Sequence, residues 1–483
     1  MKQYWLLVVF FSLAFAGVRT YLALSVQGFS DDGAYLHLRN AQHIMKTGVP
    51  IVNDVLILRE GVVISLFDYI LAAGGFVMPL ELAAKILPNL FAILSGIVFF
   101  ILSFKLSNNW KTALFSMIVF NLLPVFFSTL NAASEITLVL LLFSLLYISL
   151  LTTKPWLYVL CLILLVLVHP SAAVFILGLC ITVLLLLGEK RNLPNELIEI
   201  LLFSIFFTFT VELIMYVKPL QNFGIGLLAA AFPKEALPTA FKSLTILGAA
   251  ASVGIVTIIF ALTTLYSALV EKKTNLYYII GLISASSILL WFKLVPAETG
   301  MLFFGYATVL LFSAGYSSFA EYLEKTRLSN FAWLIHSILV IFILTTTSVQ
   351  AASAITERLR FSPDTAEKDA AEWITQYASD MLILTVPERG NYIAYMTEKK
   401  VILDTKYHLM PDAQQKYSDI SRLFSTSLEI EAVTIMEKYG ANLIYSPPHI
   451  PQPKYVPSNC LSIAYNNGAS VYAKSSACKV STR

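Results

Sequence analysis

The segment from Ser30 to Arg39, which reads SDDGAYLHLR, carries four side chains that can do chemistry together. Asp31 and Asp32 supply two carboxylates. His37 supplies an imidazole, and Arg39 supplies a guanidinium. Carboxylate oxygens are hard ligands of divalent cations such as Mg²⁺ or Mn²⁺, and a metal with cationic side chains can hold a phosphate-linked substrate. The alternatives are a polar loop without a site, and a structural brace in which Arg39 pairs with Asp31.

The composition places this segment in a membrane protein. Of the 483 residues, 57% are hydrophobic and 13% are charged, and the mean hydropathy is +0.74. These values lie outside the range of soluble globular domains and predict a polytopic membrane protein. A net charge of +3 gives no sign of a nucleic-acid partner. The first apolar run is too long for a signal peptide and lacks a small-residue cleavage site, so we expect a retained span.

Long apolar stretches predict about eleven transmembrane helices. They lie near 4–26, 82–104, 113–130, 135–152, 156–169, 171–187, 197–217, 243–270, 276–292, 301–320 and 330–350. The run 62–79 is also apolar, but Asp68, Gly74 and Gly75 interrupt it. It is therefore either a further span or a helix that lies in the membrane interface.

Basic residues choose between these two topologies, because short cytoplasmic loops are enriched in Lys and Arg. If 62–79 is interfacial and the N-terminus is inside, every predicted cytoplasmic loop carries positive charge. Counting 62–79 as a span would move all of these loops to the other side. We therefore expect a multi-pass protein of the cell (plasma) membrane, with a cytoplasmic N-terminus and an extracytoplasmic C-terminal domain.

This topology gathers more ionisable residues at the external face, at the ends of spans or in external loops. They are Glu135, His169, Glu235 and Glu298. Acidic residues at such depths are unfavourable and usually mark a site, so several on one face suggest one cavity shared with the pair in the first external loop, 27–81. The late external loop, 218–242, is moderately apolar, and we expect it to be an interfacial segment able to move over this cavity. Alternatively, each is a helix-end residue in water, and His169 belongs only to a turn made by Pro170.

The chain changes character near 356. Residues 1–355 form the predicted transmembrane domain, and 356–483 form a small α/β domain. Its expected strands are 381–386, 400–404 and 442–445, and its expected helices are 365–378 and 427–439. Cys460 and Cys478 lie in this domain and either pair outside the cytosol or remain two thiols. Cys161 and Cys180 lie in apolar runs and are expected to be packing residues.

The layout resembles the GT-C class of membrane glycosyltransferases, and most closely the catalytic subunit family of oligosaccharyltransferases, STT3/AglB. That family has an acidic motif in the first external loop, often followed by a Tyr-x-His-x-Arg-like run. Here Tyr35, His37 and Arg39 follow Asp32 in that way. The family's second acidic motif lies where a span leaves the second external loop, which matches Glu135. A later external loop carries an acidic residue ahead of a span, which matches Glu235.

Several motifs depart from the family pattern. The family has Trp-Trp-Asp-Tyr-Gly after a strand, and here the stretch from Val386 to Gly390 reads VPERG, with Asp404 downstream. In the family this motif reads the Ser or Thr of the Asn-x-Ser/Thr acceptor, so its loss argues against protein N-glycosylation. The second acidic motif has one acidic residue instead of two. The span that opens at Glu298 lacks the family's Arg near its start.

The resemblance implies transfer of a sugar or oligosaccharide from a polyprenyl-phosphate-linked donor in the membrane lipid to a glycan or protein acceptor at the extracytoplasmic face. The implied catalytic residues are Asp32, Asp31 and Glu135, of which Asp32 and Glu135 would bind a divalent metal, Mg or Mn. The implied substrate-binding residues are His37, Arg39, His169, Glu235, Glu298, Glu388 and Arg389. The alternative function is a non-catalytic GT-C-like component of a glycan-assembly pathway. A transporter is disfavoured, because the ionisable residues cluster at one face rather than at mid-membrane.

Overall fold

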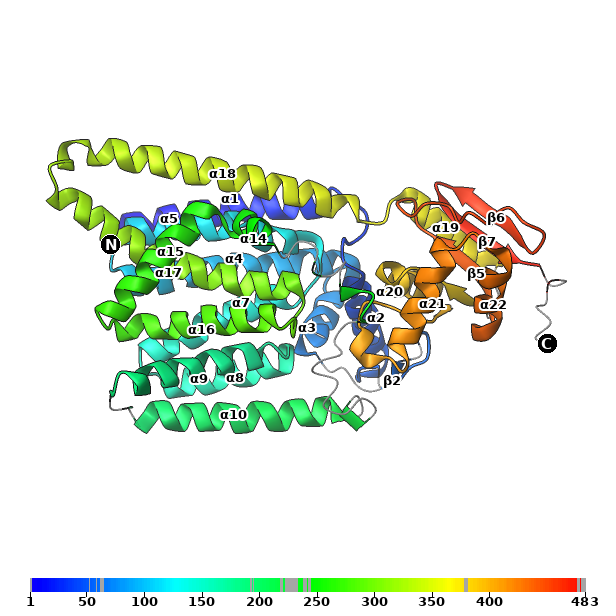
Figure 1. Ribbon diagram of the computed structural model, residues 1–483, viewed down its shortest axis with the longest axis horizontal. Coiled ribbons are helices and arrows are strands. Elements are labelled where there is room, and N and C mark those ends of the chain that lie inside the picture. The colour runs from blue at the N-terminus through cyan, green and yellow to red at the C-terminus, as the bar shows by residue number, and fades with distance from the viewer. Residues whose placement is uncertain are drawn as a thin grey trace.

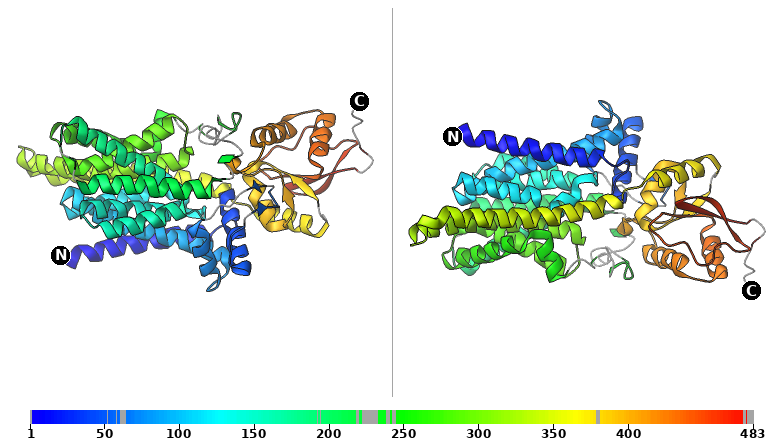
Figure 2. Two further views of the ribbon diagram at one scale, coloured as in Figure 1. Left: turned by 90° about the horizontal axis from the view of Figure 1, so that it is seen from below. Right: turned by 90° about the horizontal axis from the view of Figure 1, so that it is seen from above.

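The computed structural model describes residues 2–51, 53–57, 59–60, 65–191, 193, 195–217, 220–221, 233–237, 241, 245–377, 381–475 and 478. A bundle of long helices occupies one end of the molecule, and a small domain with a sheet occupies the other (Figures 1 and 2). The chain's N-terminal end lies at the far end of the bundle from this C-terminal domain in all three views.

The helices of the bundle account for each of the eleven predicted apolar runs. They are α1 (Lys2–Leu24), α4 (Leu80–Ser107), α5 (Trp110–Leu122), α6 (Pro124–Phe127), η1 (Ser128–Asn131), α7 (Ile136–Leu151), α8 (Pro155–Val168), α9 (Ala172–Gly188), α10 (Asn195–Met215), α14 (Ile246–Val253), α15 (Ile255–Val270), α16 (Thr274–Trp291), α17 (Ala297–Lys325), η2 (Ser329–Phe331) and α18 (Ala332–Arg360). A helix satisfies its backbone polar groups internally, as a hydrocarbon environment requires. The chain is a multi-pass membrane protein.

The number of spans depends on how bent and short helices are counted. Among the described residues, six helices are long and apolar enough to cross a membrane, or eight if two bent pairs each form one span. One bend, of 56°, precedes Pro124, and the other, of 92°, lies at Gly254. Gly254 has a φ of +91°, which a residue with a Cβ rarely adopts. Helices α7, α8 and α9 are apolar but shorter, so the count of eleven stays a prediction.

Two helices of the first external loop lie between the bundle and the C-terminal domain (Figure 1): α2 (Asp32–Thr47) and α3 (Leu66–Gly75). Ten residues of helix rise only about 15 Å, which is about half the hydrocarbon thickness. The length of α3 therefore favours the interfacial option for the run 62–79, of which residues 62–64 lie outside the described part. A short ladder, β1 (Asn53–Asp54) with β2 (Arg59–Glu60), lies between α2 and α3 in the chain.

The C-terminal domain has the α/β character that its sequence predicts. Its elements are α19 (Thr365–Tyr377), β3 (Leu382–Leu384), η3 (Pro387–Arg389), α20 (Gly390–Thr397), β4 (Lys400–Val401), η4 (Tyr407–Leu409), α21 (Ala413–Ser425), α22 (Glu429–Tyr439), β5 (Ala441–Ser446), β6 (Leu461–Asn467) and β7 (Ala469–Lys474). The strand order is β4-β3-β5-β7-β6, with β3 parallel to β4 and β5 and with β7 antiparallel to both of its neighbours. Helices α20 and α21 and strands β6 and β7 were not predicted.

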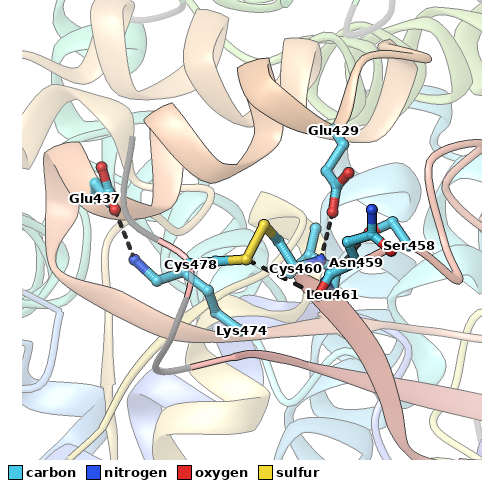
Figure 3. The surroundings of a disulfide bond; sticks show 8 residues. All are labelled: Glu429, Glu437, Ser458, Asn459, Cys460, Leu461, Lys474 and Cys478. Carbon is cyan, nitrogen blue, oxygen red and sulfur yellow. Dashed lines mark hydrogen bonds and ion pairs between the residues drawn. A yellow bond between two sulfur atoms is a disulfide. The ribbon is translucent and has the colours of Figure 1, made fainter. Parts of the chain in front are cut away.

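A disulfide closes the far end of this domain. Cys460, at the start of β6, is bonded to Cys478, which follows β7 (Figure 3). The backbone N–H of Cys460 donates to Glu429 of α22 at 2.5 Å, and Lys474 pairs with Glu437 of α22 at 3.1 Å. Helix α22 is therefore bound to the strands beside the disulfide. Of the two alternatives that the sequence left open, the structure has the bonded pair.

Candidate active site

A buried histidine joins three separate segments at the end of the bundle. His37 of α2 is 7% exposed. Its Nδ1 lies 2.6 Å from Asp68 Oδ1 of α3, and its Nε2 lies 2.7 Å from Glu135 Oε2 at the start of α7. Because a carboxylate accepts hydrogen bonds, both ring nitrogens carry a proton, and His37 is an imidazolium. Burial alone would lower the pKa of His37, but the carboxylates of Glu135 and Asp68 outweigh it and raise that pKa to about 10.

Glu135 is the point where the predicted residues of the bundle meet. Its second oxygen, Oε1, lies 3.7 Å from His169 Nε2 in the turn between α8 and α9. His169 Nδ1 accepts from the backbone N–H of Ser171 at 3.0 Å, which directs the Nε2–H toward Glu135. Lys406 of the C-terminal domain lies within electrostatic range of both groups. The structure therefore brings Glu135, His37 and His169 together, as the sequence predicts, and adds Lys406 from the C-terminal domain.

Asp68 is a member of this cluster that was not predicted as a site residue. Its Oδ2 accepts from Asn40 Nδ2 at 2.8 Å, so α2 contacts it through two side chains. Asp68 is 1% exposed. Its signal in the sequence was its position as the one charge in the apolar run 62–79. A carboxylate placed there is unfavourable unless it has a buried partner, and the partner is His37.

Asp32 points away from this cluster, into the C-terminal domain. Its carboxylate is buried and accepts three hydrogen bonds from the start of α20: from Asn391 N at 3.0 Å, Asn391 Nδ2 at 2.8 Å and Tyr392 N at 3.0 Å. Free N–H groups at a helix start favour an acceptor of this kind. Asn391 Nδ2 also donates to Asp404 at 2.9 Å, so one amide joins two carboxylates. Burial, and then the charge of Asp404, raise the pKa of Asp32 to about 7.

This raised pKa predicts a pH-dependent stability. The pKa of Asp32 in the folded protein lies above its ordinary value of 3.8, so the stability that its proton confers is complete below about pH 4 and is lost as the pH rises through about 7. In Asp32→Asn this component is expected to vanish, and in Asp404→Asn its midpoint is expected to move to lower pH. Thermal unfolding of the full-length protein in detergent from pH 4 to pH 8 measures both. An unchanged pH dependence in Asp32→Asn would contradict the assignment.

A second cluster contains the other half of the acidic pair. Asp31 is partly exposed and caps α2 by accepting from Gly33 N at 3.1 Å. Its Oδ2 lies 4.0 Å from Arg358 Nη2, and Arg358 Nη1 donates to Glu298 at 2.9 Å. Arg358 belongs to the last turn of α18, so it brings together two predicted residues that are far apart in the sequence. Its signal was a cation shortly after the last predicted span, 330–350, near the membrane surface, where charged residues often have a function or a partner.

Arg39 forms a buried ion pair within the first external loop. Its guanidinium contacts Asp54 of β1, and Asp54 also accepts from the backbone N–H of Leu56 at 3.2 Å. The brace alternative is therefore supported, with Asp54 rather than Asp31 as the partner. Asp54 lies in the part of the loop for which no site was predicted. The pairing holds β1 against α2, since both side chains are buried.

Three predicted residues lie at the C-terminal domain. Arg389 is buried and pairs with Glu367 through Nε at 2.7 Å and Nη2 at 2.9 Å, so it braces the domain internally. Glu388 precedes it and is exposed. Glu235 is also exposed, and the backbone N–H of its neighbour Lys234 donates to Gln414 of α21 at 2.7 Å. The late external loop thus contacts the C-terminal domain, although much of 218–242 lies outside the described residues.

The sequence and the structure were compared with those of known proteins. No family model matches the sequence, and no curated protein matches it significantly. Among solved structures, the oligosaccharyltransferase of Archaeoglobus fulgidus in the apo form aligns over 94% of this chain and 71% of its own, with 12% identity and a TM-score of 0.64. ArnT from Cupriavidus metallidurans bound to undecaprenyl phosphate aligns over 99% of both chains, with 11% identity and a TM-score of 0.55. Arabinofuranosyltransferase AftD from Mycobacteria aligns over 96% of this chain and 40% of its own, with 13% identity and a TM-score of 0.54.

The chain has the GT-C glycosyltransferase fold. The resemblance read from the sequence motifs is thereby confirmed at the level of the fold. The same fold accommodates neighbours described with dolichol phosphate and an inhibitory peptide, or with undecaprenyl phosphate. Because one fold hosts several chemistries, the reaction depends on the side chains at the site.

The expected metal does not fit the carboxylates of the described residues as they are arranged. One structure of the Archaeoglobus fulgidus enzyme is a complex with Zn and sulfate. Within the described part of the present chain, no group of three or more His, Cys, Asp or Glu side chains is placed to hold a metal ion. Asp32 accepts bonds from α20 with both oxygens, and Glu135 is paired with His37. The Mg or Mn cofactor stays a prediction.

Proposed function

We propose that the protein is a membrane glycosyltransferase. It transfers a sugar or oligosaccharide from a polyprenyl-phosphate-linked donor to a glycan or protein acceptor at the extracytoplasmic face of the cell membrane, with its N-terminus in the cytoplasm. The observation that carries this proposal is Glu135, a carboxylate held by the His37 imidazolium at 2.7 Å and faced by His169 at 3.7 Å where the bundle meets the C-terminal domain. The GT-C fold and the disulfide of the C-terminal domain support it.

Glu135 has the geometry of a general base. His37 binds Oε2, which fixes the carboxylate and leaves Oε1 directed toward His169 and the C-terminal domain. In the transfer step the acceptor hydroxyl oxygen bonds to the anomeric carbon of the sugar, and the bond between that carbon and the phosphate oxygen breaks. The hydroxyl proton passes to Glu135. Because the hydroxyl becomes more acidic as its oxygen bonds to carbon, a weakly basic carboxylate suffices.

The departing phosphate requires cationic partners that are not already bound to buried carboxylates. His37 and Arg39 were expected in this role, but each is held in a buried ion pair. Arg358 and Lys406 are better placed, since Arg358 lies partly exposed beside Asp31 and Lys406 lies near Glu135. Guanidinium groups suit phosphate because they donate two parallel hydrogen bonds. We assign the donor phosphate to these two side chains.

Replacing Arg358 by Gln is expected to raise the KM for a lipid-linked donor about 10-fold, because a hydrogen bond to a charged group is lost. The assay uses the full-length protein in proteoliposomes with a hexose carried on undecaprenyl phosphate, and it measures transfer to acceptors in a membrane extract. Arg360→Gln, an exposed cation two residues further on, is the matched control and should keep the KM. An equal effect of both variants would contradict a specific role for Arg358. Transfer no greater than in protein-free liposomes would overturn the proposed function.

A non-catalytic GT-C component of a glycan-assembly pathway is the second candidate. The observation that favours it is the carboxylate of Asp32, whose oxygens are both bound by α20. The test is glycan transfer by Asp32→Ala and Glu135→Ala proteins in membranes. Wild-type transfer by both variants would support the non-catalytic function over the enzyme.

A further inference from the structure

Beyond its first turns helix α10 is mostly apolar, but four polar side chains recur along it at every fourth position. They are Ser204, Thr208, Glu212 and Tyr216, of which the last directly follows the helix. Residues four apart lie on one face of a helix, so these four form a polar ladder. Phe206, Phe209 and Leu213, between them, are exposed apolar side chains suited to lipid. A polar ladder turned away from lipid needs a partner inside the protein.

The first residue of the ladder, Ser204, shows which neighbouring helix the polar face contacts. Ser204 and Tyr158 of α8 are hydrogen-bonded at 2.7 Å, so the polar face packs against α8. Both helices run in the same direction, since a single helix, α9, lies between them in the chain and returns across the bundle (Figure 1). At about 1.5 Å per residue, Tyr216 lies about 18 Å beyond Ser204, and His169 lies about 17 Å beyond Tyr158. Tyr216 is therefore level with His169, and Glu212 lies about one turn below.

A second observation places the same side chains beside the candidate active site. Tyr216 lies within electrostatic range of both Glu212 and Glu135, so this end of the ladder is near the Glu135 carboxylate. Helix α10 packs against both α8 and α9, and the turn between these two helices contains His169. The upper end of the ladder thus continues the Glu135–His169 site toward the membrane.

The ladder contains two buried polar atoms to which the described residues supply no hydrogen bond. Glu212 Oε1 and Thr208 Oγ1 are buried, and neither has a hydrogen-bond partner within the described part of the chain. Buried polar atoms in proteins are nearly always bonded, and an unbonded carboxylate oxygen in an apolar span is especially unfavourable. An ionised Glu212 requires a hydrogen-bond donor as its partner, whereas the Thr208 hydroxyl can donate or accept. A phosphate is excluded because it would be repelled, whereas a sugar hydroxyl donates to a carboxylate.

We propose that Glu212 and Tyr216 bind hydroxyl groups of the sugar on the lipid-linked donor, in a subsite directly below the Glu135–His169 site. The inference rests on the proposed function and adds a specificity-determining pair to it. Glu212 accepts from a hydroxyl of the sugar, and Tyr216 bonds a neighbouring hydroxyl. The phosphate remains with Arg358 and Lys406.

The test is equilibrium binding of two probes to the full-length protein in lipid nanodiscs: undecaprenyl phosphate, and undecaprenyl phosphate carrying one hexose. We expect the wild-type protein to bind the hexose-bearing probe about 10-fold more tightly, because hydroxyl-to-carboxylate hydrogen bonds form only with that probe. Glu212→Gln and Tyr216→Phe are expected to reduce this preference to within about twofold. Their affinity for bare undecaprenyl phosphate should not change, which also shows that both variants are folded.

Glu199→Gln is the matched control, since Glu199 is an exposed carboxylate near the other end of the same helix. It should keep the full preference for the hexose. A preference that survives in Glu212→Gln, or equal binding of both probes by the wild-type protein, would overturn the sugar subsite while leaving the lipid-phosphate donor in place. Failure of the wild-type protein to bind bare undecaprenyl phosphate would count against the proposed function itself, and with it this inference.

Discussion

Glu135→Gln is expected to lower the rate of glycan transfer by at least about 100-fold, the lower end of the range for loss of a general base. The substitution keeps the size of the side chain and its ability to accept from His37 Nε2, but it removes the group that takes the acceptor proton. The KM for the lipid-linked donor should change little, because the proposed donor contacts are Arg358 and Lys406. The measurement is steady-state transfer by the full-length protein in proteoliposomes, separated into kcat and KM.

Glu271→Gln is the control for this prediction. Glu271 is an exposed carboxylate that pairs with Lys273 in the turn between α15 and α16. It should leave both kcat and KM unchanged. Asp32→Asn is a second comparison, and it should not lower kcat as Glu135→Gln does. The Asp32 carboxylate accepts hydrogen bonds from the start of α20 and does not belong to the cluster around His37. If Asp32→Asn reduces kcat as much as Glu135→Gln does, the division of roles proposed here is wrong.

The division between Asp32 and His37 shows where reasoning from the sequence reached its limit. Both residues lie in one predicted motif, and the resemblance placed both at the substrate. On a helix, positions five apart point about 140° away from each other. Asp32 therefore reaches the C-terminal domain while His37 reaches the bundle. His37 and Asn40, three apart, share a face and reach the same carboxylate, Asp68.

Features that depend on hydrophobicity and on which ends of the helices lie together were predictable. The apolar runs became helices, the C-terminal segment became a small α/β domain, and Glu135 and His169 met at one end of the bundle. These outcomes follow from patterning and charge bias, which are local properties of the sequence. The short α3 followed from the interruptions of the run 62–79.

Contacts between distant segments were not predictable in the same way. Arg358 reaches Asp31 and Glu298 only because α18 ends beside α2 and α17. Likewise, the pairing of Asn391 with Asp32 joins residues from opposite ends of the chain. Glu212 was not predicted as a site residue. A single acidic residue in an apolar run does not show whether it faces lipid or the protein interior. The contact of Ser204 with Tyr158 provides that information, because it shows which face of α10 packs against α8.

The second large effect is expected at the buried ion pair of the C-terminal domain. Arg389→Met is expected to destabilise this domain locally by about 3–5 kcal/mol, the usual consequence of removing one partner of a buried pair. Glu367 would keep the hydroxyl of Tyr445, at 2.8 Å, as a donor, but it would lose two hydrogen bonds and its counter-charge while 2% exposed. Hydrogen exchange of the amides in α19 and β5 of the full-length protein measures the effect, and exchange should become at least about 100-fold faster.

Two further variants separate the buried charge from general damage to the domain. The double variant Arg389→Met, Glu367→Met should recover most of the lost stability, because it removes the uncompensated carboxylate and leaves apolar side chains in its place. Lys368→Met, on the same helix, breaks an exposed pair with Glu372 at 3.9 Å and should change the stability by no more than about 0.5 kcal/mol. If Arg389→Met behaves like Lys368→Met, the guanidinium is not a brace of the domain, and its predicted role in substrate binding gains support.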